Sequence, residues 1–309
     1  MSRAILLGTP EAALPALRVL EPLVELAAVV TRPDRPRGRS GRPRPSPVKQ
    51  AAQEHGLEIL QPETAAELDA MVDALEPLDV GVVVAFGMLI PATTLRRPHR
   101  GFVNVHFSLL PRWRGAAPVE RAILAGDKTT GVSLILLDEG LDTGPVLSVE
   151  ATPIGPEENR AELTDRLATL GAGMLADTLP GYLAGEIRSE PQPENGVTRA
   201  RRITPEDRWL DPSLTSAEVL RRVRALAPRP GAYAITAGQR IQLLEARPAD
   251  HPGIPPGEVR AEDGPVFLGT GDGAIQLAVV QPEGRSPMAA SAWLRGVRRG
   301  PVVLESPPG

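Results

Sequence analysis

The sequence predicts an α/β fold in which a Rossmann-like parallel-sheet domain is followed by a small OB-like β-barrel domain. Short apolar runs alternate with helical patterns over the first half of the chain, and this alternation is typical of a parallel sheet. Short strand patterns separated by turns fill the last third, which favours a small barrel. A chain of 309 residues is long enough to form both domains.

The elements of the first domain follow from the hydrophobic periodicity of the chain. Strands are predicted over Ala4–Gly8, Val24–Thr31, Leu57–Leu60, Asp79–Phe86 and Gly101–Ser108. Helices are predicted over Glu11–Leu20, Val48–Gly56, Thr64–Leu75 and Ala116–Ala125. The run Asp79–Phe86 is nearly continuous in apolar residues, as expected of a strand that is buried on both faces.

The remaining elements set the domain boundaries. Strands over Thr130–Asp138 and Pro145–Ile154 flank a tight loop, and a helix over Arg160–Gly185 closes the first domain. A helix over Ser216–Ala227 opens the second domain. Its strands are predicted over Ala232–Thr236, Ile241–Arg247, Gly257–Ala261, Val266–Thr270 and Ala274–Val280. We therefore assign residues 1–188 to the first domain, 189–204 to a polar linker and 205–309 to the second domain.

The composition excludes several classes of site. The chain has no cysteine, which excludes disulfides, thiolate metal sites and a cysteine nucleophile. Its four histidines are too dispersed for an obvious zinc site, so no metal is expected. The first strand lacks the glycine pattern that a dinucleotide requires, and there is no P-loop. No apolar run approaches the ~20 residues of a membrane helix. We expect a cytoplasmic monomer without membrane contact.

The charge is distributed unevenly along the chain. The formal net charge is −4, yet residues 199–309 hold 15 Arg against 12 acidic residues. Within the acidic remainder, residues 32–49 hold six Arg and one Lys against one Asp. A basic island on an acidic domain indicates a local anionic partner, although an ordinary solvated loop would also explain it.

Asn104 and His106 are the first candidate catalytic residues. They stand two apart after an apolar lead-in, so in a strand both side chains point to one face. Val105 and Phe107 then point away from that face. An amide is a hydrogen-bond donor and an imidazole is a proton carrier, so the pair suits chemistry better than packing.

Asp142 joins this pair through the topology of the fold. It lies in a loop rich in glycine and, taken alone, would be assigned to a turn. The crevice of a parallel α/β sheet lies at the carboxyl ends of its strands. Asn104, His106 and Asp142 all fall at or just beyond such ends, so we expect them to converge. The rigid turn Ser108–Pro111 could line a flat apolar pocket there.

These motifs carry a resemblance to a known family. Asn104–Pro118 and Leu137–Gly144 resemble the formyltransferases that use 10-formyltetrahydrofolate. The basic stretch Thr31–Arg39 and the run Trp113–Pro118 narrow the likeness to the branch that acts on methionyl-tRNA. The turn Gln281–Arg285 resembles one in the carboxyl-terminal domain of that branch, and the likeness covers nearly the whole chain.

The resemblance implies an enzyme that moves the formyl group of 10-formyltetrahydrofolate to the amino group of methionyl initiator tRNA, for translation initiation. It implies a catalytic set of Asn104, His106 and Asp142. It implies a folate site made of Ser108, Leu109, Leu110, Pro111, Phe86, Gly87, Glu139, Gly140 and Leu141.

The contacts to tRNA are predicted in two places. The resemblance implies that the basic loop enters the acceptor end of the tRNA through Arg35, Arg37, Arg39 and Arg42, with Arg39 the most important. The positive excess near the linker adds Arg201 and Arg202, where ordinary surface charge is the alternative.

The chemistry expected of these residues needs neither a metal nor a covalent intermediate. Asn104 and a protonated His106 would donate to the tetrahedral oxyanion, and Asp142 would favour the imidazolium and help to move the amine proton. Phe107 stands where the family usually has Gly, and Phe86 stands where Tyr is frequent. Three alternatives stay open: an amino-sugar nucleotide formyltransferase, a formylfolate hydrolase and an inert RNA-binding module.

Overall fold

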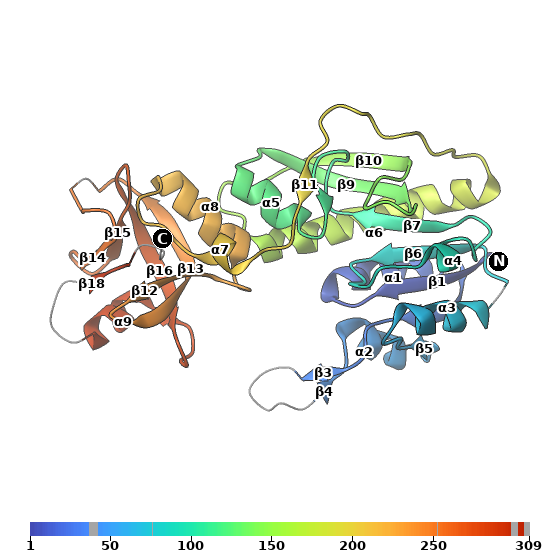
Figure 1. The fold of residues 1–309 in the computed structure, drawn as a ribbon, viewed down its shortest axis with the longest axis horizontal. Helices are drawn as coiled ribbons and strands as arrows, with labels where there is room; N and C mark the ends of the chain where they lie inside the picture. Colours follow the sequence, from blue (N-terminus) through green and yellow to red (C-terminus); the bar gives the residue numbers. More distant parts are fainter. Residues whose placement is uncertain (37–42, 76, 252, 298–301, 306–309) are drawn as a thin grey trace. The chain divides into compact units, whose positions relative to one another are not determined.

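The computed structural model describes residues 1–309 except 37–42, 76, 252, 298–301 and 306–309. The chain forms two compact units, which Figure 1 shows in sequence colours. The first unit consists of Met1–Gly115, Thr129–Pro153 and Thr164–Arg199. The second consists of Ala116–Lys128, Ile154–Leu163 and Ala200–Gly309. The chain thus passes between the units more than once, and the boundaries at 188 and 205 stay a prediction.

A seven-stranded sheet forms the centre of the first unit. Its strands are β1 (Arg3–Gly8), β2 (Glu25–Val30), β5 (Ile59–Leu60), β6 (Val80–Val84), β7 (Phe102–His106), β9 (Thr129–Leu136) and β10 (Val146–Pro153). They lie in the order β10-β9-β7-β6-β1-β2-β5. The strands from β5 to β7 are mutually parallel, which confirms the predicted parallel sheet. The β9–β10 hairpin extends it in antiparallel fashion.

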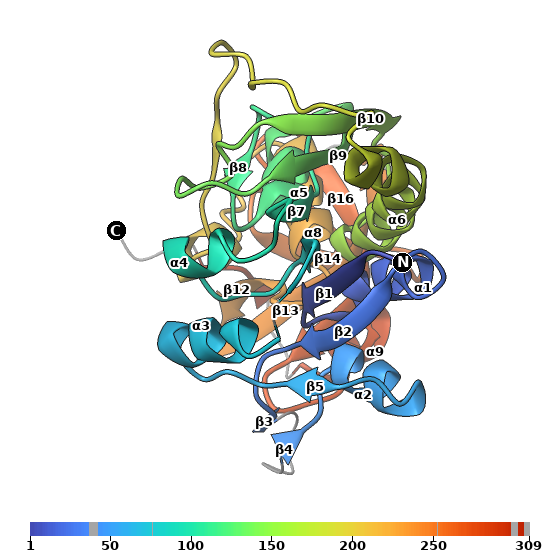
Figure 2. The same cartoon turned by 90° about the vertical axis from the view of Figure 1, so that its right-hand side faces the viewer.

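Helices cover both faces of this sheet. They are η1 (Glu11–Ala13), α1 (Leu14–Leu20), α2 (Pro47–Glu54), α3 (Ala65–Asp73), α4 (Ala92–Leu95) and α6 (Arg160–Ala184). Figure 2 shows α1 and α6 on one face and α3 and α4 on the other. Four short strands complete the unit and its border: β3 (Arg35–Pro36), β4 (Pro43–Arg44), β8 (Arg114–Gly115) and β11 (Arg199–Ala200).

The core beneath α3 explains why β6 contains a glycine. All five residues of β6 are buried, as its apolar run predicts. A Cβ at Gly81 would lie 2.1 Å from the ring of Phe102, which is fully buried on the neighbouring strand. Leu68 and Val72 of α3 pack into the same apolar cluster. The missing side chain at position 81 therefore makes room for the fully buried ring of Phe102.

The second unit is built around a nearly closed antiparallel barrel. Its strands are β12 (Ala232–Thr236), β13 (Gln239–Ala249), β14 (Glu258–Ala261), β15 (Val266–Gly269), β16 (Ala274–Pro282), β17 (Met288–Ala289) and β18 (Val302–Val303). The order is β12-β13-β16-β15-β14-β18, and a bridge between Ile235 and Glu305 brings the two ends of the sheet together. The predicted barrel is thereby confirmed.

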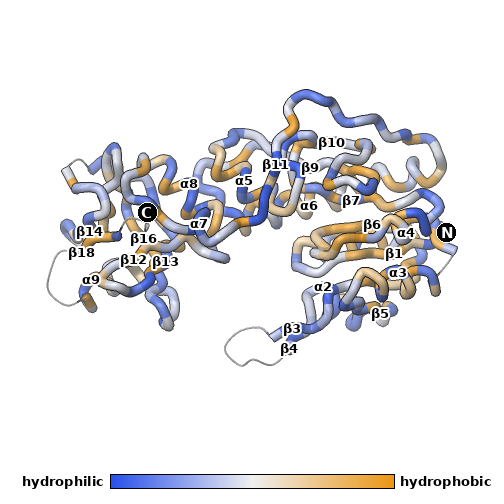
Figure 3. Tube along the Cα trace, viewed as in Figure 1, coloured by the Kyte–Doolittle hydropathy of each residue, from blue (hydrophilic) through white to orange (hydrophobic). Residues whose placement is uncertain are grey.

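Helices accompany the barrel in the second unit. They are α5 (Pro118–Ala125), α7 (Pro205–Arg208), α8 (Ser216–Leu226) and α9 (Ala290–Gly296). Thr215 begins α8 with a capping box that Glu218 completes, and Gly126 ends α5 in the left-handed conformation. Figure 3 shows apolar residues gathered on the central strands, whereas the segment that leads to β11 is hydrophilic.

Candidate active site

The end of β7 places Asn104 and His106 on one face of the sheet, as the period of two requires. In the register with β9, Asn104 lies opposite Ile135 and His106 lies opposite Ser133. His106 is only 5% exposed, whereas Asn104 is half-buried. No described residue hydrogen-bonds to the side chain of Asn104, so its amide is free to bind a substrate.

One ring nitrogen of His106 is held by the backbone. Its Nε2 atom lies 2.9 Å from the carbonyl oxygen of Trp113. A carbonyl oxygen can only accept, so Nε2 carries the hydrogen and donates it. The other ring nitrogen, Nδ1, faces the carboxylate of Asp142 with 3.7 Å between Nδ1 and Oδ1. The structure therefore brings His106 and Asp142 together, as the sequence predicted.

The carboxylate of Asp142 is oriented by its second oxygen. Oδ2 accepts a hydrogen bond of 2.8 Å from the backbone N–H of Gly115. Asp142 has a φ of 53°, which an aspartate adopts at some cost. The preceding turn is tied by Asp138, whose carboxylate accepts from the backbone N–H of Gly140 and from the hydroxyl of Thr143. Asp142 thus lies on a loop that side-chain hydrogen bonds hold at several points.

The residues expected to hold folate divide into buried and open ones. The side chains of Ser108, Leu110 and Phe86 are buried, and Phe86 packs in the core beneath α3. The backbone at Gly87 is open, since a Cβ there would meet no atom within 4 Å. Leu141 is 56% exposed. Leu109, Pro111, Glu139 and Gly140 are half-buried or exposed.

The turn after β7 is held from below by Ser133 of β9. The hydroxyl of Ser133 donates to the carbonyl of Ser108 and accepts from the backbone N–H of Leu110. The hydroxyl of Ser108 donates to the carbonyl of Arg112. These bonds leave Leu109 and Pro111 as the partly exposed residues of the turn.

The basic loop begins and ends in a short antiparallel hairpin. Arg35 of β3 pairs with Arg44 of β4, and both are exposed. Below the hairpin, Asp34 accepts hydrogen bonds from the ammonium group of Lys49 and from the amide of Gln61. These bonds lower the pKa of the Asp34 carboxyl below its ordinary value. Arg37, Arg39 and Arg42 lie outside the described residues.

Arg201 and Arg202 lie in the second unit with exposed side chains. Their backbone carbonyls accept from the guanidinium of Arg121, which also forms a bidentate pair with Asp207 at 2.8 and 2.7 Å. These bonds hold the backbone that carries the exposed side chains of Arg201 and Arg202.

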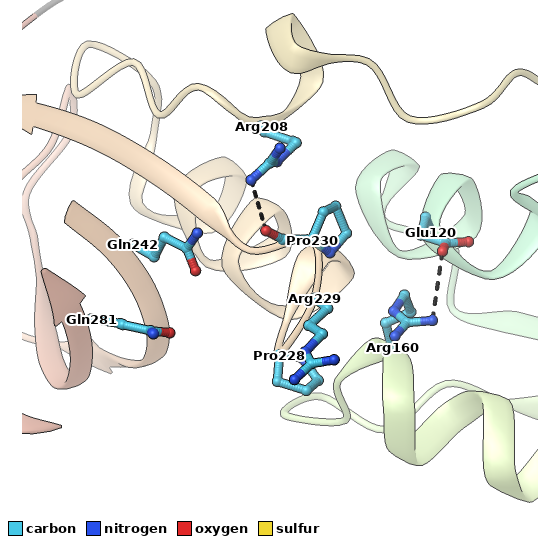
Figure 4. Close-up of a pocket in the computed structure, with 8 residues that line it drawn as sticks. All are labelled: Glu120, Arg160, Arg208, Pro228, Arg229, Pro230, Gln242 and Gln281. Atoms are coloured by element: carbon cyan, nitrogen blue, oxygen red, sulfur yellow. Dashed lines mark hydrogen bonds and ion pairs between the residues drawn. The ribbon is translucent and has the colours of Figure 1, made fainter. Parts of the chain in front are cut away.

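The second unit also contains a pocket of about 700 Å³ that the sequence did not reveal (Figure 4). It is lined by Glu120, Arg160, Arg208, Pro228, Arg229, Pro230, Gln242 and Gln281. We call it the arginine pocket. Arg160 lies 3.8 Å from Glu120, and Arg208 donates to the carbonyl of Pro230. Burial raises the pKa of Glu120, although Arg160 lowers it in part.

The cations beside this pocket are crowded. Arg208 and Arg240 both lie over the ring of Tyr233, at 5.5 and 3.8 Å from its centroid. Burial and the neighbouring charge of Arg240 lower the pKa of Arg208. Two nitrogens of Arg240, Nε and Nη2, are buried without a hydrogen-bond partner. A group of closely spaced cations such as this favours the binding of an anion.

Comparisons with known proteins define the class of this fold and site. Residues 11–179 match the family described as formyl transferase, and residues 202–298 match the formyl transferase carboxyl-terminal domain. The protein is therefore a formyl transferase, in agreement with the resemblance found in the motifs.

Relatives that match this chain over nearly their whole length identify the family within the formyl transferases. The chain is 45% identical over 301 residues to the methionyl-tRNA formyltransferase of Streptomyces griseus, covering 96% of this chain and 97% of the relative. It is 47% identical over 304 residues to that of Halorhodospira halophila, covering 97% and 98%. The chain belongs to the methionyl-tRNA formyltransferase family.

Solved structures with a similar fold include HypX from Aquifex aeolicus in complex with tetrahydrofolic acid. That likeness has a TM-score of 0.70 at 21% identity and covers 96% of this chain but 47% of HypX. The methionyl-tRNA formyltransferase from Clostridium thermocellum has a TM-score of 0.56 at 17% identity, over 81% of this chain and 95% of that one. Among the described residues, no helix is both long and apolar enough to cross a membrane.

Proposed function

We propose that the protein transfers the formyl group of 10-formyltetrahydrofolate to the amino group of methionyl initiator tRNA and so serves translation initiation. One observation carries the proposal: an imidazole held through one ring nitrogen, with the other facing a carboxylate, lies beside an unpartnered amide. The relatives named methionyl-tRNA formyltransferase support the choice of acceptor.

The reaction has one carbon at its centre. The methionine amine attacks the formyl carbon, the carbonyl oxygen becomes an oxyanion, and the bond from carbon to the folate nitrogen then breaks. One proton leaves the amine and one reaches the folate nitrogen, so no net proton is consumed. The side-chain NH₂ of Asn104 donates to the oxyanion. Loss of one such donor typically lowers the rate by about 10²–10³-fold.

His106 and Asp142 have separate roles in proton transfer. Because Nε2 of His106 donates to the carbonyl of Trp113, Nδ1 is the nitrogen that exchanges a proton with the substrate. The distance of 3.7 Å between Nδ1 and Asp142 Oδ1 is longer than that of an ordinary hydrogen bond. Nδ1 is therefore available to form a hydrogen bond with the substrate. Asp142 stabilises the charged imidazole and accepts the amine proton.

Folate is assigned to the rim of this site. The partly exposed Leu109, Pro111 and Leu141 offer apolar surface for a flat ring. The open backbone at Gly87 offers hydrogen-bonding groups without steric hindrance from a side chain, and Gly140 is exposed on the loop that carries Asp142. This rim is the cofactor-binding part of the proposal, with folate as the formyl donor.

The tRNA is assigned to cations of both units. The exposed Arg35 at the root of the basic hairpin and the exposed Arg201 and Arg202 suit contacts with phosphates. In the arginine pocket, Arg208 and Arg229 add positive charge, and Gln242 can bond to sugar hydroxyls.

An acceptor assay tests the proposed function. The protein is incubated with 10-formyltetrahydrofolate and with water alone, an amino-sugar nucleotide or charged initiator tRNA, and free tetrahydrofolate is followed. We expect release that depends on the tRNA and yields formylmethionyl-tRNA. Equal release in water alone would make the protein a hydrolase, and release that requires the sugar would make it a sugar formyltransferase. Tight tRNA binding without any turnover would leave only an RNA-binding module.

A further inference from the structure

We propose that Gln192 and Thr198, in the segment interpreted from sequence as a linker, are positioning residues of the catalytic site. The inference rests on the proposed function insofar as it takes His106 and Asp142 as the working pair. The segment is residues 190–198, and we call it the strap. Most of its residues are exposed, yet Gln192 and Thr198 are half-buried.

Thr198 holds the turn that carries the partner of His106. Its hydroxyl oxygen accepts a hydrogen bond of 2.8 Å from the backbone N–H of Trp113. Its carbonyl accepts from the N–H of Arg114 at 2.9 Å, and its own N–H donates to the carbonyl of Pro111 at 3.3 Å. The peptide on either side of Trp113 is therefore tied to one residue, which lies 85 positions away in the chain.

The turn needs this support because of its backbone. Trp113 has a φ of 63°, in the left-handed region that a bulky residue rarely adopts. Such a conformation is unfavourable and persists only where surrounding bonds impose it. It directs the carbonyl of Trp113 to His106 Nε2. Thr198 thus acts on the imidazole through one intervening residue.

Gln192 holds the other catalytic loop in the same way. Its side-chain NH₂ donates to the carbonyls of Asp142 and Gly144, both at 2.8 Å. Its side-chain oxygen accepts from Nε and Nη2 of Arg114, at 2.9 and 2.7 Å. Asp142 is the second residue of the site in the left-handed region. Trp113 and Asp142, the two residues that carry the partner and the carboxylate of His106, are therefore both bonded to the strap.

The strap thereby sets the geometry between two loops that come from distant parts of the chain. Arg114 belongs to β8, which follows the turn after β7, and Asp142 belongs to the loop after β9, yet both bond to Gln192. The strap is itself fixed at its start, where Glu190 and Val146 exchange backbone hydrogen bonds of 2.7 and 2.8 Å. A shift of about 1 Å in such an arrangement can lower a rate about a hundredfold.

Kinetics of Thr198 variants test the inference. Thr198→Val keeps the shape and removes the acceptor for the N–H of Trp113. We expect kcat to fall by about ten- to a hundredfold while KM for both substrates changes less than about threefold. Thr198→Ser restores the acceptor and should recover most of kcat. Val197→Thr, at the neighbouring 42% exposed position, is the matched control and should behave as wild type. A wild-type kcat in Thr198→Val, or equal losses in Thr198→Ser, would overturn the proposal.

A spectroscopic readout separates this inference from the proposed function, because it needs no substrate. With only four histidines, ¹⁵N-histidine NMR can resolve the ring nitrogens of His106. Above the ordinary titration range of histidine, we expect the neutral ring of wild type to carry its hydrogen on Nε2. Thr198→Val should mix the two tautomers, and Thr198→Ser should not. An unchanged tautomer in Thr198→Val refutes the strap even if the enzyme formylates tRNA. A mixed tautomer upholds it even if the acceptor is another molecule.

Discussion

At the catalytic edge of the first unit, one atom of each titratable side chain is bonded to the backbone. Nε2 of His106 donates to a carbonyl, and Oδ2 of Asp142 accepts from an N–H. In the arginine pocket of the second unit, three guanidinium groups line the cavity with one carboxylate, that of Glu120. Hydrogen bonds to the backbone fix the orientation of both side chains in the first region, whereas the second region gathers positive charge.

The difference matches two kinds of recognition. Proton transfer depends on tenths of an ångström and on which ring nitrogen carries the hydrogen. Binding to a phosphate backbone depends mainly on charge, is sensitive to salt and tolerates lateral displacement. Changes at the catalytic edge should therefore act on kcat, and changes in the arginine pocket should act on affinity for RNA and on its salt dependence.

The largest effect is expected from Asp142→Asn. The amide still accepts from the N–H of Gly115 but no longer stabilises a charged His106 or takes a proton from the amine. The single-turnover rate should fall about 10²–10³-fold, while folate still binds. Stopped-flow measurement gives the single-turnover rate, and calorimetric titration with folate shows whether folate still binds. Near-normal turnover would show that the carboxylate does not serve the imidazole.

A smaller effect is expected from Gln192→Glu. The carboxylate keeps its acceptor oxygens for Arg114 but cannot donate to the carbonyls of Asp142 and Gly144. We expect kcat to fall about tenfold as the loop moves. Steady-state kinetics measures this change, and Gln53→Glu, on the exposed side of α2, is the control for added charge. If both variants lose the same activity, the loss belongs to overall charge and not to the strap.

The arginine pocket should respond in binding rather than in chemistry. Arg229→Gln removes one exposed cation, so tRNA binding should weaken a fewfold and its salt slope should fall by about 0.9 if one phosphate contact is lost. The matched control is Arg260→Gln on β14, where the guanidinium is paired with Glu258. Filter binding across a salt series gives both slopes. If Arg229→Gln lowered kcat and left the salt slope of tRNA binding unchanged, the two regions would not differ in the way described.

The smallest effect is expected at the root of the basic hairpin. Because the pKa of Asp34 is lowered in the folded protein, its contribution to stability is present above the ordinary carboxylate pKa. That contribution is lost as the pH falls from about 4 towards the lowered value. The pair with Lys49 is partly exposed, so it should contribute at most about 1 kcal/mol. Thermal unfolding at pH 6 and at pH 3 measures this, and Asp34→Asn should flatten the acid loss. An identical acid loss in both proteins would contradict the assignment.

The sequence was most informative where periodicity and topology determine structure. The apolar run of β6, the position of Asn104 and His106 on one face of β7, and the meeting of His106 with Asp142 all follow from rules of strands and parallel sheets. The barrel strands were also predicted with small errors at their ends, because hydrogen bonding to the neighbouring strand decides where each strand stops.

The sequence was least informative where single contacts join distant residues. A hydrogen bond from the N–H of Trp113 to Thr198 has no periodicity, so a polar stretch such as the strap resembles an ordinary linker. The left-handed backbone of Trp113 could not be foreseen either, because glycine and asparagine are the usual signals for it. The arginine pocket escaped notice because Arg160 and Arg208 converge only in the folded unit.

A crystal structure of the protein with a non-transferable analogue of 10-formyltetrahydrofolate tests the central claim most directly. The account predicts that the formyl oxygen lies about 3 Å from Asn104 Nδ2, with Nδ1 of His106 and the carboxylate of Asp142 around the same carbon. A folate bound elsewhere, or one whose formyl group points away from these three side chains, would contradict it.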